Sequence, residues 1–422
     1  MTENQIILSM VNPSRSSKFY VLGTAFLSLF ALVGFAYYGL SFFFDFMTGE
    51  YGWSRAEVTS GNALGKLLVG PLFGFIAGWM IDRFGPKKLM VTGTLLMGTA
   101  LIGLSFANTL GLFYMFYILN ALGYVFGGPL PCQVLISRNF DRSRGKAMGM
   151  AYLGIGVGGA LAPLLSAGLE ARFGWHTALC ALGFLIILVA TPLPLFMKVK
   201  SAAKPNPETH NRPMEPLGNL FRNKNFYLLA SGSMCSMGAV GGIGQHLKLY
   251  LRDLDYSQPQ AAHVMSTMLL ASLAGRLLMG WLADRINRKY VMLIIYLTIA
   301  SVISMLFVPE FPGRMFLFAV VFGIGMGGDY MIIPLMAGDL FGVRVLGRVM
   351  GIVLVADGVA ESLFPVLVGV LYNEQVKNYS AGFALLVAVA LTGALIVSLL
   401  PGSPVRKSHG ETVPIADLKP KI

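Results

Sequence analysis

The chain is poor in charge and in cysteine for its length. Only 12% of its 422 residues are Asp, Glu, Lys or Arg, against about 25% in a soluble domain, so we do not expect a soluble globular protein. Its three cysteines (Cys132, Cys180 and Cys235) lie far apart in apolar runs, without a Cys–X–X–Cys pair or a Cys/His cluster. This spacing argues against a disulfide framework and against a cysteine-bound metal. No nucleophile–base pair, metal-ligand cluster or phosphate-binding loop occurs at usable spacing, so we expect neither an enzyme nor a bound cofactor.

The chain is instead rich in apolar residues and in glycine. Hydrophobic residues make up 55% of it, 50 residues are glycine, and the mean hydropathy is +0.68. Runs of about 20 apolar residues are long enough to cross a bilayer as helices, and small residues let such helices pack closely in lipid. We therefore predict an all-helical integral membrane protein that is surrounded by the lipid bilayer.

The apolar runs predict twelve membrane-spanning helices. We place them at roughly 19–46, 55–80, 88–106, 111–137, 146–170, 175–197, 225–252, 260–284, 289–308, 313–338, 346–372 and 380–400. With the N-terminus in the cytoplasm, the tails and loops on that side hold 24 of the 32 basic residues, and the outer side holds six. This bias predicts that both termini are cytoplasmic. It also accounts for the net charge of +12 without a nucleic-acid partner.

The longest connector divides the chain into two parts. Residues 198–224 are rich in Pro, Asn and charge, which is typical of a cytoplasmic linker. We expect six-helix bundles at 19–197 and 225–400, with polar cytoplasmic tails at 1–18 and 401–422. The first 18 residues lack the short apolar core of a cleavable signal peptide.

One short motif occurs twice, about 200 residues apart, and each copy ends a long apolar run. The first copy is Gly78-Trp-Met-Ile-Asp82-Arg83-Phe-Gly-Pro-Lys-Lys. The second is Gly280-Trp-Leu-Ala-Asp284-Arg285-Ile-Asn-Arg-Lys. In a hydrophobic chain, a long repeat of this kind indicates two structurally equivalent halves, as in a transporter built by duplication.

Twelve spans, a central linker and the duplicated G-x3-D-R motif together resemble the major facilitator superfamily. The resemblance covers nearly the whole chain and implies alternating access between two bundles. It also implies that the motif residues Gly78, Asp82, Arg83, Gly280, Asp284 and Arg285 hold one conformation, with each Asp capping a neighbouring helix. An acidic side chain near a helix N-terminus suits that role.

Finer features resemble the monocarboxylate transporter and oxalate–formate antiporter branch. They are His246-Leu-Lys-Leu-Tyr-Leu, Gly275-Arg276-Leu-Leu-Met-Gly and the stretch from Phe341 to Arg348. The resemblance implies that Arg276 binds the substrate carboxylate. The chain departs from both patterns: Ser272 stands where monocarboxylate carriers have an Asp, no Lys occurs in the first span, and the eleventh span carries acids in place of a second cation. These departures argue against a two-cation site for a dicarboxylate.

Five ionisable residues are predicted at bilayer depth, where each charge costs on the order of 3 kcal/mol in insertion measurements and so needs a reason. They are Lys66, Arg276, Asp329, Asp357 and Glu361. At about 1.5 Å of rise per residue they fall into two tiers, Arg276 with Asp329 and Asp357, and Lys66 with Glu361. We hypothesise that Lys66 pairs with Glu361 or Asp357 across the bundles. Arg276 then binds the anion, with Asp329 as its resting counter-ion and proton carrier. Alternatively, the five form static ion pairs that stabilise packing.

Polar aromatic residues and one histidine complete the candidate site. His246, near the outer end of the seventh span, is a candidate for gating or proton passage, or is a hydrogen-bonded structural histidine. Tyr37, Tyr38, Asn120, Tyr124 and Tyr330 lie at depths where they either line a substrate path or form hydrogen bonds between helices.

We therefore predict a secondary active transporter, functional as a monomer in a bacterial inner membrane, that moves a small lactate-like monocarboxylate together with a proton. The alternatives are an exchanger of organic anions or dicarboxylates, a drug-like exporter, and a non-transporting receptor for the same anion. Vesicle uptake separates these classes, because a receptor binds without accumulation. Neither the anion nor the direction of transport follows from the sequence.

Overall fold

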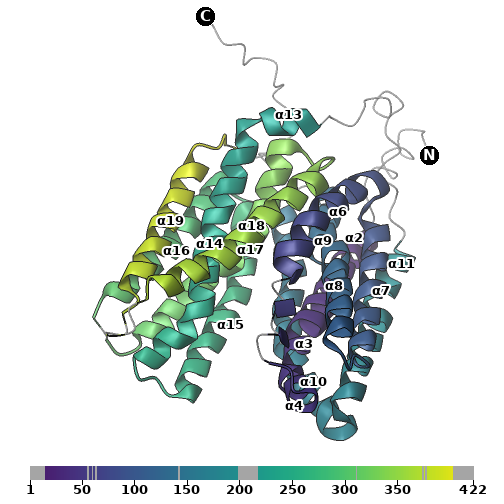
Figure 1. Ribbon diagram of the computed structural model, residues 1–422. Helices are drawn as coiled ribbons and strands as arrows, with labels where there is room; N and C mark the ends of the chain where they lie inside the picture. The colour runs from purple at the N-terminus through teal and green to yellow at the C-terminus, as the bar shows by residue number, and fades with distance from the viewer. Residues whose placement is uncertain are drawn as a thin grey trace, which may run out of the picture.

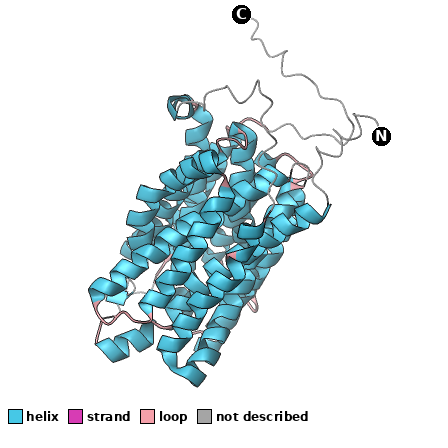
Figure 2. Ribbon diagram, turned by 90° about the vertical axis from the view of Figure 1, so that its right-hand side faces the viewer, coloured by secondary structure: helices cyan, strands magenta, loops and turns pink. Residues whose placement is uncertain are grey.

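The computed structural model describes residues 15–402, apart from 55, 56, 59, 62, 63, 141, 142, 198–216, 310, 373, 374, 376 and 377. Long helices joined by short loops make up the described part of the chain (Figure 2). The expected all-helical class is thus confirmed for these residues. The expected linker lies mostly outside them, and so do most of the two expected tails.

The first half begins with three elements that follow one another closely, α2 (Arg15–Leu29), the π-helix η1 (Phe30–Gly39) and α3 (Leu40–Phe42). The remaining elements of this half are α4 (Phe44–Tyr51), η2 (Leu64–Val69), α6 (Gly70–Phe84), α7 (Pro86–Leu104), α8 (Leu110–Gly127), α9 (Pro129–Asn139), α10 (Arg144–Ala190) and α11 (Pro192–Phe196). A π-helix is rare and occurs mostly as single turns at functional sites, so η1 is a notable irregularity.

The second half repeats the pattern of long helices. Its elements are α13 (Leu217–Arg222), α14 (Lys224–Asp253), α15 (Gln258–Ala283), α16 (Arg288–Ser304), the short 3-10 helix η3 (Met305–Phe307), α17 (Arg314–Phe341), α18 (Leu346–Val370) and α19 (Ser380–Ser398). Local sequence determines where several of these helices begin. Ser257 and Gln260 form a capping box at α15, in which each side chain binds the other's backbone N–H.

Ten helical stretches among the described residues are long and apolar enough to cross a membrane. One of them, Arg144–Phe196, has 53 residues and is broken at Gly174, whose φ of 76° is not helical. The expected fifth and sixth spans lie on either side of this glycine. The expected second span falls on η2 and α6, which are not among the ten.

The elements form two bundles that lie side by side (Figure 1). We call α2–α11 the first bundle and α14–α19 the second bundle. They meet where α6 packs against α18 and α10 against α15. Glycines allow these contacts, because a Cβ atom added at Gly78 would lie 2.2 Å from the Gly347 carbonyl oxygen, and one added at Gly145 would lie 2.2 Å from that of Gly280. The close approach holds the repeated motifs against the opposite bundle.

Candidate functional site

Arg276 lies on α15 where the two bundles meet and is 7% exposed. Its Nε and Nη1 atoms form no hydrogen bond with any described protein atom. The side chains close enough to interact with it electrostatically are Tyr38, Tyr152 and Tyr330. A buried guanidinium group that lacks an acidic partner among the described residues is costly, so this arrangement suits an anion that comes from outside the protein.

The glycine-rich stretch of α10 makes room for this arginine. A Cβ atom added at Gly156 would lie 3.0 Å from Arg276 Nη1 and 2.0 Å from Leu273 Cδ2. A Cβ atom added at Gly149 would lie 2.4 Å from the Arg276 carbonyl oxygen. A side chain at position 149 therefore displaces the α15 backbone, and one at position 156 displaces the Leu273 and Arg276 side chains, so these glycines of the first bundle help to set the position of the arginine of the second.

A group of tyrosines from both bundles surrounds the same region. Tyr37 and Tyr38 come from η1, and the rings of Tyr37 and Tyr124 are 6.3 Å apart. Tyr330 of α17 interacts electrostatically with Tyr37, Tyr38 and Tyr124. The structure thus brings together four of the five polar residues proposed to line the substrate path. The fifth, Asn120, is buried on α8, and its Oδ1 atom has no hydrogen-bond partner among the described residues.

Two residues near Arg276 were missed in the sequence. Gln133 Nε2 donates to the hydroxyl of Tyr152 at 2.6 Å, and both side chains are buried. A buried amide needs a partner, and this bond holds Tyr152 beside Arg276. The signal was available, since Gln133 and Tyr152 are polar residues within expected spans, but apolar patterning does not say which faces meet.

The expected charge pairs differ from those in the structure. Asp329 accepts a hydrogen bond from Ser236 at 2.6 Å and makes no ion pair with Arg276. Asp357 accepts one from Ser233 at 2.6 Å, inside its own bundle; the Lys66 side chain lies outside the described residues, so its pairing with Asp357 stays a prediction. The expected Arg276–Asp329 pair is absent because depth along the helix axis does not give the rotation of a side chain about that axis.

Of the second tier, Lys66 and Glu361, the structure describes only one side chain. Glu361 of α18 lies near Tyr124 and Tyr330, so it faces the tyrosine group. Lys66 belongs to η2, but its side chain lies outside the described residues, and the Lys66–Glu361 pair stays a prediction. Of the described residues, no group of three or more His, Cys, Asp or Glu is placed to hold a metal ion.

His246 joins three helices of the second bundle near their ends. Its Nε2 atom lies 2.8 Å from the carbonyl oxygen of Pro365, and its Nδ1 atom lies 3.5 Å from the hydroxyl of Tyr379. These contacts favour the hydrogen-bonded structural reading of this histidine. They connect α14 with α18 and with the start of α19.

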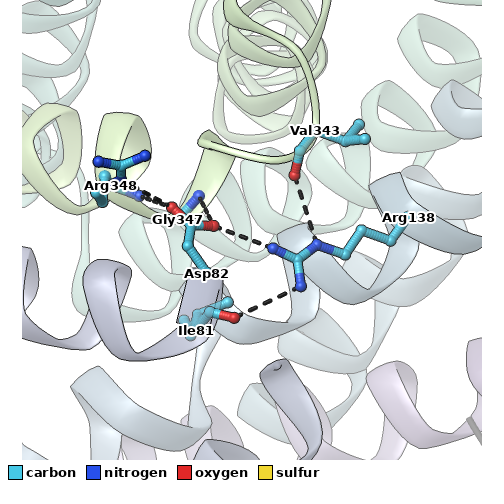
Figure 3. A network of polar contacts seen from close by, with 6 residues as sticks. All are labelled: Ile81, Asp82, Arg138, Val343, Gly347 and Arg348. Atoms are coloured by element: carbon cyan, nitrogen blue, oxygen red, sulfur yellow. Dashed lines mark hydrogen bonds and ion pairs between the residues drawn. The ribbon is translucent and has the colours of Figure 1, made fainter. Parts of the chain in front are cut away.

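The first motif aspartate closes a network between the bundles (Figure 3). The Asp82 side chain is fully buried and accepts from the backbone N–H groups of Gly347 and Arg348 at 3.2 and 3.0 Å. Arg138 Nη2 lies 3.1 Å from Asp82, and the Arg348 Nε lies 3.4 Å from it. The same Arg138 donates to the Val343 carbonyl oxygen at 3.5 Å. Asp82 thus caps α18 and carries two cationic partners.

The second motif aspartate makes the matching contact with α10. Asp284 accepts from the backbone N–H groups of Gly145 and Lys146 at 2.7 and 2.9 Å. This carboxylate lies directly after the apolar stretch His263–Ala283. Its burial raises its pKa above the usual aspartate value, and the two N–H groups offset part of that rise. Each motif aspartate therefore holds a helix N-terminus of the opposite bundle.

The motif arginines lie outside this network. Arg83 and Arg285 are exposed, and each guanidinium group lies over the ring of the tryptophan four positions earlier, 5.2 Å from the Trp79 ring and 4.0 Å from the Trp281 ring. The partners of the aspartates belong to a second repeat that was missed, Gly145-Lys-Ala-Met-Gly149 and Gly347-Arg-Val-Met-Gly351. Its two copies are 202 positions apart, as are Asp82 and Asp284.

Comparison with known proteins gives a family match and a set of relatives. The model of the Major Facilitator Superfamily matches residues 26–262 and 232–418. An agnestins efflux protein of Paecilomyces divaricatus is 25% identical over 371 residues, which cover 84% of this chain and 80% of the relative. Monocarboxylate transporter 13 of Bos taurus is 27% identical over 327 residues (76% and 74% covered). Monocarboxylate transporter 11 of Homo sapiens is 30% identical over 346 residues (76% and 69% covered).

Two solved structures share the fold. The fucose:proton symporter of E. coli aligns with a TM-score of 0.68 at 14% identity, covering 90% of this chain and 98% of that one. The proton:xylose symporter XylE aligns with a TM-score of 0.72 at 14% identity, covering 92% and 97%. At this identity the likeness shows the fold alone.

Proposed function

The chain belongs to the Major Facilitator Superfamily and is an integral multi-pass membrane transporter, and from this premise we propose that it moves a small monocarboxylate together with a proton. Its sequence relatives include monocarboxylate transporters. The proposed monocarboxylate is lactate-like, and the proposed coupling is symport with a proton. Arg276, the tyrosine group and the buried acids are the residues proposed to carry out this function.

One observation carries the proposal, namely the buried guanidinium of Arg276, whose Nε and Nη1 atoms have no hydrogen-bond partner in the part of the chain that the structure describes. A carboxylate can accept two parallel N–H bonds from one guanidinium group, which is the geometry that favours arginine at such sites. Tyrosine hydroxyls supply further donors nearby. One buried cation suits one carboxylate, and the proton keeps the overall step from leaving a net buried charge.

We propose that the two aspartate contacts close the cytoplasmic side of the carrier. They join α6 to α18 and α15 to α10, and so they oppose separation of the bundles at this end. At the opposite end, the described polar contacts of Tyr51 with His176 and of Tyr372 with Asp253 stay within one bundle. Opening of the closed side then requires both helix caps to break, which is one half of an alternating-access cycle.

The finer topology belongs to the same proposal. The basic-residue bias supports cytoplasmic termini. The break at Gly174 and the apolar stretch at η2 and α6 add two spans to the ten long apolar stretches, which gives the proposed twelve. We also propose that residues 19–197 and 225–400 form two six-helix bundles, which the two groups of helices in Figure 1 support. We further propose a monomer in a bacterial plasma membrane.

The decisive experiment is uptake of radiolabelled lactate into proteoliposomes, with and without an inward acid-to-alkaline pH gradient. Pyruvate, formate and oxalate serve as competitors. We expect gradient-driven accumulation that is lost in Arg276→Ala and reduced in Arg276→Lys, because a lysine keeps the charge but not the two-pronged geometry. Asp45→Asn, an exposed acid of α4, serves as the matched control and should accumulate lactate like the unmodified protein.

Three other outcomes would change the assignment. Exchange only against preloaded anion points to an antiporter, and binding without uptake points to a receptor. Accumulation that persists in Arg276→Ala contradicts the role given to this arginine.

A specific observation also favours a second candidate, an exporter of a larger organic acid. Five tyrosines lie around Arg276 and Glu361, which is more aromatic surface than a three-carbon acid needs. One relative is an efflux protein. Competition by aromatic carboxylates that exceeds competition by lactate would favour this alternative.

A further inference from the structure

Two buried acids of the second bundle are separate from the arginine site. Asp329 of α17 is 0% exposed and Asp357 of α18 is 5% exposed. Among the described residues, neither forms an ion pair with a Lys, Arg or His. Two ionised carboxylates in such a place repel each other and lack solvation, so the pair tends to hold a proton or another cation.

The two carboxyl groups are arranged along one face of a single helix. Asp357 binds Ser233 and Asp329 binds Ser236, both at 2.6 Å. These serines are three positions apart on α14, so they are neighbours on its surface, with about 5–6 Å between their Cβ atoms. The serines therefore place both acids beside the same turn of α14.

A fourth helix points a buried hydroxyl group at the same place. Tyr296 of α16 is 0% exposed, and its hydroxyl has no hydrogen-bond partner of normal geometry among the described residues. Its neighbours are the Ser236 hydroxyl, Asp329, Asp357 and Cys235. One oxygen of each acid, Asp329 Oδ1 and Asp357 Oδ2, is likewise buried and unpaired. Three polar atoms that converge without partners indicate a site for a small ligand.

Hydrogen counting favours a proton as that ligand. Ser233 Oγ lies 3.0 Å from the Ala230 carbonyl oxygen and 2.6 Å from Asp357, but a hydroxyl has only one proton to donate. If Ser233 donates to the carbonyl, which can only accept, then Asp357 must supply the proton of the shorter bond.

The acid site is connected to the arginine site through α17. Tyr330, the residue after Asp329, interacts with the tyrosine group on the other side of this helix. Added Cβ atoms at Gly327 and Gly275 would lie 2.1 Å from the Ser272 carbonyl oxygen and 2.3 Å from that of Ile324, so the backbones of α17 and α15 are in close contact. Pro334 removes the helical hydrogen bond to the Tyr330 carbonyl oxygen, which lets α17 bend at this level.

We propose that Asp329 and Asp357 form a two-carboxyl proton site, held by Ser233, Ser236 and Tyr296, that carries the proton moving with the anion. Besides Tyr296, the titratable groups that face the pair are Cys235 of α14 and Glu361 of α18. The inference rests on the proposed proton-coupled transport and names where the proton is bound. In this proposal Asp329 is not the resting counter-ion of Arg276. The proton site and the anion site are instead coupled through α17.

Infrared difference spectroscopy of the full-length protein in liposomes tests the site without transport. A protonated carboxyl group has its own C=O stretching band, which disappears when the group ionises. We expect such a band in the unmodified protein and its loss or shift in Asp329→Asn and in Asp357→Asn. Tyr296→Phe should shift the band because the nearby hydroxyl is lost, and Asp45→Asn should leave it unchanged. A band that is unaffected by both Asn substitutions overturns the inference.

Transport provides the second readout. One proton per anion allows an accumulation ratio of about 10 for each unit of pH gradient. We expect this ratio to fall to about 1 in Asp329→Asn and Asp357→Asn, while exchange of labelled for unlabelled anion continues, because Arg276 still binds the substrate. Elution of both variants as a single species in size-exclusion chromatography verifies that they fold. Retained proton-driven accumulation in either variant, or accumulation that follows a sodium gradient instead, contradicts the proposal.

The proposed function and the proposed proton site can be contradicted separately. If no carboxylate is transported, the proposed function fails, but the infrared bands still show whether the pair holds a proton. If lactate accumulates with the proton gradient while the bands ignore both acids, the function stands and the proton site lies elsewhere.

Discussion

The two halves of this transporter carry the same closing motif but surround it differently. Asp82 and Asp284 each accept two backbone N–H groups from a helix of the opposite bundle. Asp82 is fully buried and also pairs with Arg138 and Arg348. Asp284 is less buried; Arg288 and Lys146 lie near enough to attract it, but no direct ion pair is described for it. The position that corresponds to Arg138 in the second half is Leu340.

The comparison shows that two copies of the same backbone contact can have different numbers of charged side chains around them. Capping needs only a carboxylate near a helix N-terminus, so both copies keep it. The additional cations make Asp82 the member of the pair whose removal leaves buried charges behind. We therefore expect the two closing contacts to differ in strength although their geometry is alike.

The largest expected effect comes from replacing the two motif aspartates by Asn, one at a time. Asp82→Asn should destabilise the closed state by about 3–5 kcal/mol, the usual cost of breaking a buried ion pair. Asp284→Asn should cost about 1–2 kcal/mol, because it weakens a helix cap and the attraction of Arg288 and Lys146 but breaks no described ion pair. Distances between spin labels on the two bundles at the motif side measure the closed fraction. Asp45→Asn serves as the neutral control. Equal changes of the closed fraction in Asp82→Asn and Asp284→Asn would contradict the expected difference in strength between the two contacts.

An intermediate effect should come from the glycines, and here the halves should respond alike. A Cβ atom at Gly145 would lie 2.2 Å from the Gly280 carbonyl oxygen, and one at Gly347 would lie 2.6 Å from that of Gly78. Alanine at either position should open the closed side by about 1–3 kcal/mol, the usual cost of overpacking.

Matched controls exist on the same two helices. No atom of the described residues lies within 4 Å of a Cβ atom added at Gly168 or Gly358, so alanine there should leave the spin-label distances unchanged. A response to only one of Gly145→Ala and Gly347→Ala would show that the second repeat is not mechanically equivalent.

The smallest expected effect is a pH response to which both motif aspartates contribute. Burial in the closed state raises the pKa of Asp82 to about 6 and the pKa of Asp284 above the usual value, whereas opening exposes the carboxyl groups to water and restores the usual value. Between the two values the closed form holds protons that the open form does not, so acidification should favour closure. The spin-label distances should show a closed fraction that rises from neutral to mildly acidic pH. An identical rise in the double variant Asp82→Asn, Asp284→Asn would assign the response to other groups.

Parts of the site could be predicted from the sequence, each for a physical reason. Arg276 was identifiable because a charge within an apolar run is costly and rare, and Asp82 and Asp284 because they repeat at a fixed separation. Tyr37, Tyr38, Tyr124 and Tyr330 were found from their depth. Gln133, Ser233, Ser236 and Tyr296 were missed, since small or singly polar side chains in a span are also common at ordinary helix contacts.

The sequence by itself determined the membrane class, the two-fold repeat and the depth of each buried charge, because apolar length and spacing along a helix axis are one-dimensional properties. Only the tertiary structure decided which charges meet. Asp329 and Tyr330 are neighbours in the chain, yet one faces Ser236 and the other faces the tyrosine group. Successive residues on a helix are turned by about 100°, and the close contacts of Gly275 and Gly327 fix that rotation. The partner of each buried charge is therefore set by helix packing.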